Sequence, residues 1–137
     1  MVMVMINYIS CMYCFSLIGY VPHHHRGHPL GLKVLDNPES QGRGFMGWEQ
    51  PPNDQYGMLF KHSHIKPQSY WMQDVPFDLD CLGFDEDDRL VQVLHLKAHS
   101  KASRSFIRGV RHVVEVRGGW CDDHEIKGGE RLILKNL

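Results

Sequence analysis

Short apolar runs separated by turn-forming residues make up the chain from about residue 30 onward. Glycine, proline, asparagine and aspartate cluster between the runs, and these residues favour turns over strand interiors. Residues 85–88 are all acidic and lie between two of the runs, which predicts a hairpin. The runs that we predict to be strands are residues 32–35, 57–60, 69–72, 79–84, 90–96, 111–116 and 131–134.

Helical signals are few and short. Asn37 followed by Pro38 and Glu39 suits a turn or the start of a helix. The glycine-rich residues 42–47 allow one helical turn followed by a loop, and the acids near residue 122 suit the first turn of a short helix at 120–125. The pattern predicts a mainly β (β-rich α+β) fold: a barrel- or sandwich-like single domain with one or two short helices.

The amino-terminal segment differs in composition from the rest. Residues 1–21 contain no Lys, Arg, Asp or Glu, so they lack the basic residues that precede the apolar run of a signal peptide. Polar residues such as Asn7 and Ser10 dilute the apolarity that a span of ~20 residues needs. An ordered extension, a membrane-associated or processed segment and a mis-assigned start codon all stay open. We expect a cytoplasmic or virion-associated location.

A histidine-rich stretch between Pro22 and Pro29 has the composition of a linker. We therefore predict that residues 1–29 form an apolar, then histidine-rich extension, and that residues 30–137 form the β domain. The Cys11-x-x-Cys14 pair before this stretch provides the right ligand types for zinc. No regular second pair of ligands follows at the expected distance, so we predict only loose metal affinity, no specific metal site and no cofactor.

Charge argues against one class of partner and leaves another open. The formal net charge of −1 excludes a globally basic nucleic-acid binder. Residues 90–114 contain no acid, and a basic loop at 97–111 is a possible site for a polyanion. The alternative is a solvated loop balanced by the acidic hairpin. The candidate anion-binding residues are Lys97, Lys101, Arg104, Arg108 and Arg111.

Two carboxylates stand inside otherwise apolar strands. Asp80 and Glu115 either face solvent, form a structural ion pair or perform acid–base catalysis. Arg43, placed between two glycines, is the expected partner if they are buried. Nucleophilic catalysis lacks support because no nucleophile elbow or phosphate loop is present.

Large apolar residues give a second set of candidates. Trp71 and Met72 are adjacent, so on a strand they face opposite sides, and one of them can line a pocket with Met46 and Met58. Packing in the core is the alternative, and it also applies to Trp120.

Five segments, in order, resemble domain-of-unknown-function family 192. They are residues 43–47 (Arg-Gly-Phe-Met-Gly), 57–60, 70–72 leading to Leu79-Asp80, 114–120 and 126–132. The resemblance covers residues 32–134 and implies a β-rich domain of bacteria, archaea and phages without an established activity. Gln73, Asp74 and Val75 stand where the family often has lysine, asparagine and threonine, so a ligand held by that lysine is not implied here.

The sequence therefore predicts a small binding or structural module rather than an enzyme. One alternative is a virion-associated structural protein of a phage that docks on a protein partner through residues 1–22. The other is an unrecognised enzyme that uses Asp80 and Glu115.

Overall fold

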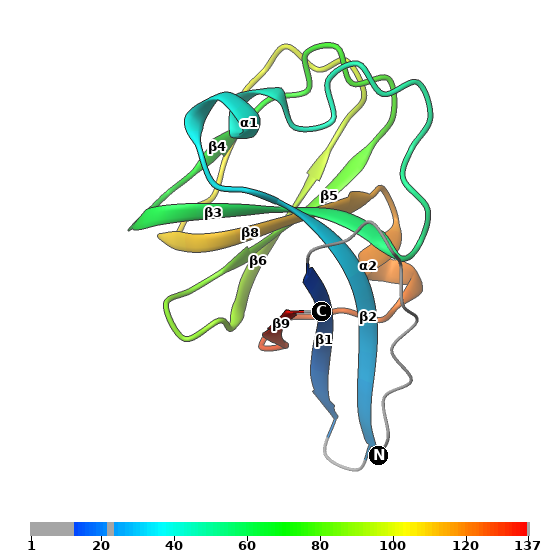
Figure 1. The fold of residues 1–137 in the computed structure, drawn as a ribbon, viewed down its shortest axis with the longest axis vertical. Coiled ribbons are helices and arrows are strands. Elements are labelled where there is room, and N and C mark those ends of the chain that lie inside the picture. The colour runs from blue at the N-terminus through cyan, green and yellow to red at the C-terminus, as the bar shows by residue number, and fades with distance from the viewer. Residues whose placement is uncertain (1–12, 22–23, 137) are drawn as a thin grey trace.

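The computed structural model describes residues 13–21 and 24–136, which form strands, two short helices and connecting loops (Figure 1). The mainly β fold predicted from the sequence is confirmed. The elements in chain order are β1 (Tyr13–Val21), β2 (His24–Leu35), α1 (Pro38–Arg43), β3 (Tyr56–Lys66), β4 (Ser69–Tyr70), β5 (Leu79–Phe84), β6 (Leu90–Leu96), β7 (Arg104–Ser105), β8 (Val110–Arg117), α2 (Trp120–Asp123) and β9 (Arg131–Asn136).

Seven of these strands form one curved, mixed sheet. Its order is β6-β5-β8-β3-β2-β1-β9, with β2 and β3 parallel and the other neighbours antiparallel. β9 returns to the turn between β5 and β6, where the amide of Leu90 donates to the carbonyl of Glu130. Only one isolated bridge, between Arg89 and Arg131, joins these described segments, so the sheet does not close into a barrel.

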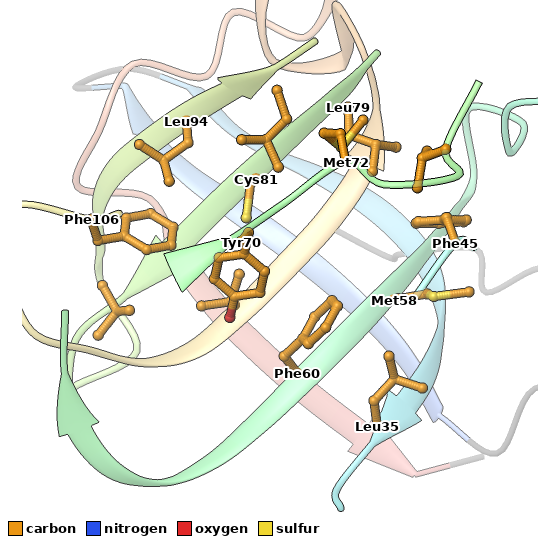
Figure 2. Packing of buried hydrophobic residues seen from close by; sticks show 14 of the residues in the cluster. Leu35, Phe45, Met58, Phe60, Tyr70, Met72, Leu79, Cys81, Leu94 and Phe106 are labelled. Carbon is orange, nitrogen blue, oxygen red and sulfur yellow. The ribbon is translucent and has the colours of Figure 1, made fainter. Parts of the chain in front are cut away.

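The sheet buries both of its faces. Along β5 and β8 the side chains alternate, so Cys81 and Val113 enter one apolar cluster while Leu82 and Val114 enter the other. We call these the pocket-side cluster and the α2-side cluster. The pocket-side cluster includes the aromatic residues drawn in Figure 2, and the α2-side cluster contains Trp120. Two carboxylates on one strand pair can therefore meet entirely different surroundings.

The predicted strands outside the central hairpin have other limits, and two of them show why. The hairpin of 79–84 and 90–96 has the predicted bounds, but β3 continues through the expected polar loop to Lys66, because pairing with β8 resumes beyond a bulge. β4 is shorter than expected because the chain turns at Met72, whose carbonyl accepts from the amide of Val75.

The histidine-rich stretch is part of a strand and not a linker. β2 begins at His24 and runs through residue 30 without a break, and Gly27 and His28 pair with Ile18 and Leu17 of β1. A strand ladder uses backbone groups, so polar or glycine residues can extend it. The division at residue 30 stays a prediction.

The two helices are short, as predicted. The side chain of Asn37 caps α1 by accepting the amide of Ser40 at 2.9 Å. α2 ends at Asp123, two residues earlier than expected. In the part of the chain that the structure describes, neither helix has the length or apolarity to cross a membrane.

Candidate functional site

A pocket of about 230 Å³ lies between α1 and the pocket-side face of the sheet. Its walls come from α1, β3, β4, β5 and β8, and four of the five segments that resemble family 192 contribute to it. The lining residues are Gln41, Gly42, Arg43, Gly44, Phe45, Met46, Phe60, His62, Ser69, Tyr70, Trp71, Val75, Leu79 and Glu115.

Glu115 is the buried carboxyl of this pocket. It lies on β8 opposite Met58 of β3 and Cys81 of β5, both of which belong to the pocket-side cluster. Only 5% of its surface is exposed, and no described residue donates a hydrogen bond to its carboxyl group. Burial in this apolar setting raises the pKa of Glu115 to about 8. At neutral pH the side chain is therefore mostly protonated.

Tyr70 and His62 form the polar part of the wall. The Tyr70 hydroxyl lies 2.7 Å from Nε2 of His62. Burial, together with the nearby Lys66 and His112, lowers the pKa of His62 to about 4, so its ring is neutral at physiological pH. Burial also raises the pKa of Tyr70, which keeps its proton. The tautomer of the neutral ring sets the direction of this hydrogen bond: Tyr70 donates when the proton of His62 is on Nδ1, and Nε2–H donates when it is on Nε2.

Arg43 lies at the rim and does not pair with the buried acids. Its guanidinium contacts Glu39 one helical turn earlier, at 3.2 Å, and its side chain is 67% exposed. The predicted ion pair with Asp80 or Glu115 is wrong because α1 places residue 43 on the outer surface, where an i,i+4 partner is available.

Trp71 is also at the rim. It is 53% exposed, whereas Met72 is buried, so the predicted opposite orientation of the pair is observed. The expectation that Trp71 holds the core together is wrong, because β4 has ended by that residue and the chain turns Met72 inward. Met46 lines the pocket and Met58 lies in the core beside Glu115.

Asp80 lies on the opposite face of the sheet. It pairs with Val116 of the α2-side cluster, and its carboxylate accepts the amide of Cys121 and contacts Nδ1 of His95, both at 2.9 Å. Its partner is therefore His95 instead of Arg43. Sequence reasoning missed this histidine, which lies directly opposite Asp80 because the hairpin register shifts between Gly83 and Phe84.

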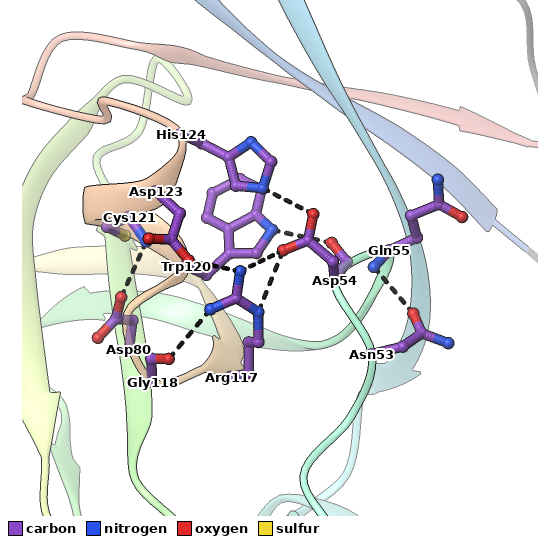
Figure 3. A network of polar contacts seen from close by, with 10 residues as sticks. All are labelled: Asn53, Asp54, Gln55, Asp80, Arg117, Gly118, Trp120, Cys121, Asp123 and His124. Atoms are coloured by element: carbon purple, nitrogen blue, oxygen red, sulfur yellow. Dashed lines mark hydrogen bonds and ion pairs between the residues drawn. The ribbon is translucent and has the colours of Figure 1, made fainter.

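Trp120 belongs to a polar network that fastens α2 to the loop before β3 (Figure 3). Its indole donates to the carbonyl of Asp54 at 2.9 Å, and the Asp54 carboxylate contacts both Arg117 and His124. Arg117 also contacts Asp123 at 2.8 Å. Trp120 is 1% exposed and packs in the α2-side cluster, so its role here is structural and it does not line the Glu115 pocket.

Two of the five candidate residues in the predicted basic loop have polar partners. Lys97 contacts Asp78 at 3.4 Å, and Arg104 donates to the carbonyl of His95. Three further candidates are exposed and make no ion pair with a described residue. They are Lys101, Arg108 and Arg111. Polyanion binding here stays a prediction.

The cysteine side chains of the predicted metal-binding motif lie outside the described part of the structure. Cys11 is outside the described residues, and Cys14 is placed only as a backbone position in β1. Within residues 13–21 and 24–136, no group of three histidine, cysteine or acidic side chains is arranged to hold a metal ion. Cys81 and Cys121 are buried free thiols, and burial raises the pKa of each.

A family profile matches the part of the chain that forms the sheet and lines the pocket. The profile of DUF192, described as "Uncharacterized ACR", matches residues 21–134. The chain belongs to the DUF192 family. The match begins before residue 30, so it includes all of β2. No curated protein matches the sequence.

Two crystal structures share the DUF192 fold seen here. A proposed transcription regulator from Sinorhizobium meliloti 1021 has a TM-score of 0.83 and 24% identity, with 96% of this chain and 100% of that chain covered. A protein of unknown function from Novosphingobium aromaticivorans DSM 12444 has a TM-score of 0.79 and 18% identity, with 88% and 83% covered. At these identities the similarity shows the fold alone.

Proposed function

We propose that this DUF192 domain is a binding module that holds a small ligand in the Glu115 pocket. The observation that carries the proposal is Glu115 itself, a buried carboxyl that reaches the pocket without a hydrogen-bond partner among the described residues. A hydrogen bond from a ligand to this carboxyl group contributes ~0.5–3 kcal/mol, the range from neutral to charged hydrogen bonds. A strongly shifted pKa in a cleft is also typical of functional sites.

The geometry favours binding over the catalytic alternative. Chemistry by paired carboxylates needs both groups on one substrate, ~5–10 Å apart with the substrate between them. Asp80 and Glu115 project from opposite faces of the sheet, and Asp80 is already occupied by His95 and the Cys121 amide. The two acids therefore do not form a catalytic pair. Docking on a protein partner through residues 1–22 stays a separate prediction.

A nuclear magnetic resonance screen tests the proposal. The full chain, labelled with ¹⁵N, is titrated with a mixture of small amines, carboxylic acids, alcohols and sugars. We expect at least one compound to shift the amides of residues 42–46, Tyr70, Trp71 and Glu115 together. Glu115→Gln should weaken that compound, and Asp80→Asn should not. Shifts confined to other surfaces, or equal affinities for the two variants, would contradict the proposal.

A further inference from the structure

We propose that the ligand of the Glu115 pocket is a small organic cation, whose ammonium group binds the Glu115 carboxylate beside Tyr70 and Trp71. This inference rests on the binding function proposed above. It adds the chemical class of the ligand, and its test separates a wrong class from the absence of a binding site.

The inner polar groups of the pocket can accept hydrogen bonds from a ligand. Glu115 is mostly protonated at neutral pH, and its ionised form, which has no donor among the described residues, only accepts. An ammonium group only donates, so it suits the ionised form and displaces the proton, and the phenolic oxygen of Tyr70 has a further lone pair for a donor. Of the described lining residues, only Arg43 is permanently cationic, and Glu39 balances its charge at the rim.

Aromatic rings add a second attraction for a cation. Tyr70 and Phe60 meet edge to face, with ring centroids 5.2 Å apart and an angle of 86° between the planes. Trp71 leaves about half of its surface exposed at the mouth of the pocket. Aromatic faces attract ammonium groups by ~0.5–2 kcal/mol when the cation lies within ~6 Å of the ring centroid.

The volume limits the size of the ligand. About 230 Å³ corresponds to roughly seven waters at ~30 Å³ each. An ammonium group on a short aliphatic chain fills such a space, whether it belongs to a free amine or to a lysine side chain of a partner peptide. The experiment includes one probe of each kind.

Binding of a cation at this site is expected to depend on pH. The groups that face Glu115 are Tyr70 from β4 and Cys81 from β5, with Arg43 on α1 and His62 on β3 further along the wall. Burial raises the pKa of Tyr70 and Cys81, and burial lowers the pKa of His62 to about 4, so these three groups do not change charge between pH 6 and 9. Glu115 does, because its pKa is about 8.

Isothermal titration calorimetry with n-butylammonium chloride and the full chain measures this coupling. Since the carboxylate form binds, the affinity should rise roughly 90-fold from pH 6 to pH 9, following the ionised fraction of a group with a pKa of about 8. At pH 7, titrations in phosphate and in HEPES should show release of roughly 0.9 proton per ligand, the protonated fraction of such a group. The ligand stays charged over this range, because alkylammonium groups lose their proton near pH ~10.

Three variants assign the effect to named residues. Glu115→Gln should weaken n-butylammonium about tenfold or more at pH 9 and remove the pH dependence. Trp71→Ala should weaken binding equally at every pH, because the ring carries no titrating group. Asp80→Asn is the matched control on the opposite face and should bind like the wild type. Should Glu115→Gln fail to fold, the wild-type pH profile decides alone.

Other outcomes separate this inference from the binding function. If n-butanol or butanoate binds in the pocket and n-butylammonium does not, the cation is wrong but the pocket is still a binding site. Butylammonium binding without proton release, and unchanged in Glu115→Gln, also overturns the inference. A peptide with one lysine that binds more tightly than the free amine supports the class and identifies the source as a protein side chain. If no compound of any class binds in the pocket, both proposals fail.

Discussion

Asp80 and Glu115 lie in successive residue pairs of two neighbouring strands, and this difference of one position gives their carboxyl groups different partners. Asp80 pairs with Val116 and Glu115 with Cys81, so the two acids are diagonal neighbours that project from opposite faces. Asp80 is held by a histidine and a backbone amide, whereas Glu115 has no described donor and faces a pocket. Both acids stand among apolar residues in a predicted strand, so the sequence alone did not indicate that their surroundings differ.

The pH dependence of stability should reveal Glu115. Its pKa rises from an ordinary 4.5 to about 8 on folding, so the folded state binds the proton more tightly than the unfolded state. This contribution is fully present below pH ~4.5 and is lost as the pH rises to ~8, with a total of ~3–5 kcal/mol. Relative to wild type, Glu115→Gln should therefore become more stable as the pH rises from 5 to 8.5. Urea unfolding at both pH values measures the difference, and a constant gap between the two proteins would contradict the buried, unpaired carboxyl.

Two tryptophans should respond very differently to the same truncation. Trp120 is 1% exposed, so Trp120→Ala should cost ~3–5 kcal/mol. Trp71 is 53% exposed, so Trp71→Ala should change the stability by less than ~1 kcal/mol while it weakens ligand binding. Chemical denaturation of both variants checks the contrast. A large loss of stability in Trp71→Ala would return this residue to the structural role that the sequence suggested.

Elements with a strong local pattern could be predicted from the sequence, and contacts between elements could not. The two apolar runs and the acidic turn between them predicted the hairpin of β5 and β6 with its observed bounds. The prediction that Arg43 pairs with a buried acid was wrong because it required the side chain of Arg43 to point from α1 toward the sheet. Nothing in the local sequence fixes the orientation of this helix against the sheet. The partner of Asp80 also depends on a feature that the local pattern does not contain, because the register shift between Gly83 and Phe84 places His95 opposite Asp80.

Asp80 should matter mainly for the attachment of α2. In Asp80→Ala the amide of Cys121 loses its acceptor in a buried position, at a cost of ~1–3 kcal/mol. Hydrogen exchange should then accelerate at Cys121 and its neighbours in α2, while β3 exchanges as before. Asp80→Asn keeps an oxygen for the amide and should stay close to wild type. Uniform acceleration across the whole sheet would show that Asp80 does more than anchor this helix.

At the scale of the whole molecule, the pocket joins segments that are distant in the chain. Residues from α1, β3, β4, β5 and β8 meet there because the sheet order brings β8 between β5 and β3. The resemblance to family 192 identified four of these segments. It did not predict that they line one pocket, since the order of strands in the sheet cannot be read from five short motifs. Tyr70 and His62 were missed as a pair for the same reason.

The amino-terminal strands make truncation informative. The sequence suggested that residues 1–29 can be removed at little cost, but β1 pairs with both β2 and β9. We expect deletion of residues 1–23 to lower the melting temperature by more than ~5 °C, because β9 loses its neighbour. Deletion of residues 1–12 is the comparison, because it leaves β1 in place. Equal melting temperatures for the two truncated chains would support the division at residue 30.

The titration of Glu115 tests the central claim most directly. Carboxyl carbon shifts of ¹³C-labelled glutamate, followed by nuclear magnetic resonance with Glu115→Gln for assignment, give the pKa in the free protein and with n-butylammonium. We predict a midpoint near the value of about 8 in the free protein and a clear decrease when the ligand is present. A midpoint near the ordinary 4.5, unchanged by the ligand, would contradict both the buried unpaired carboxyl and its role as the binding group.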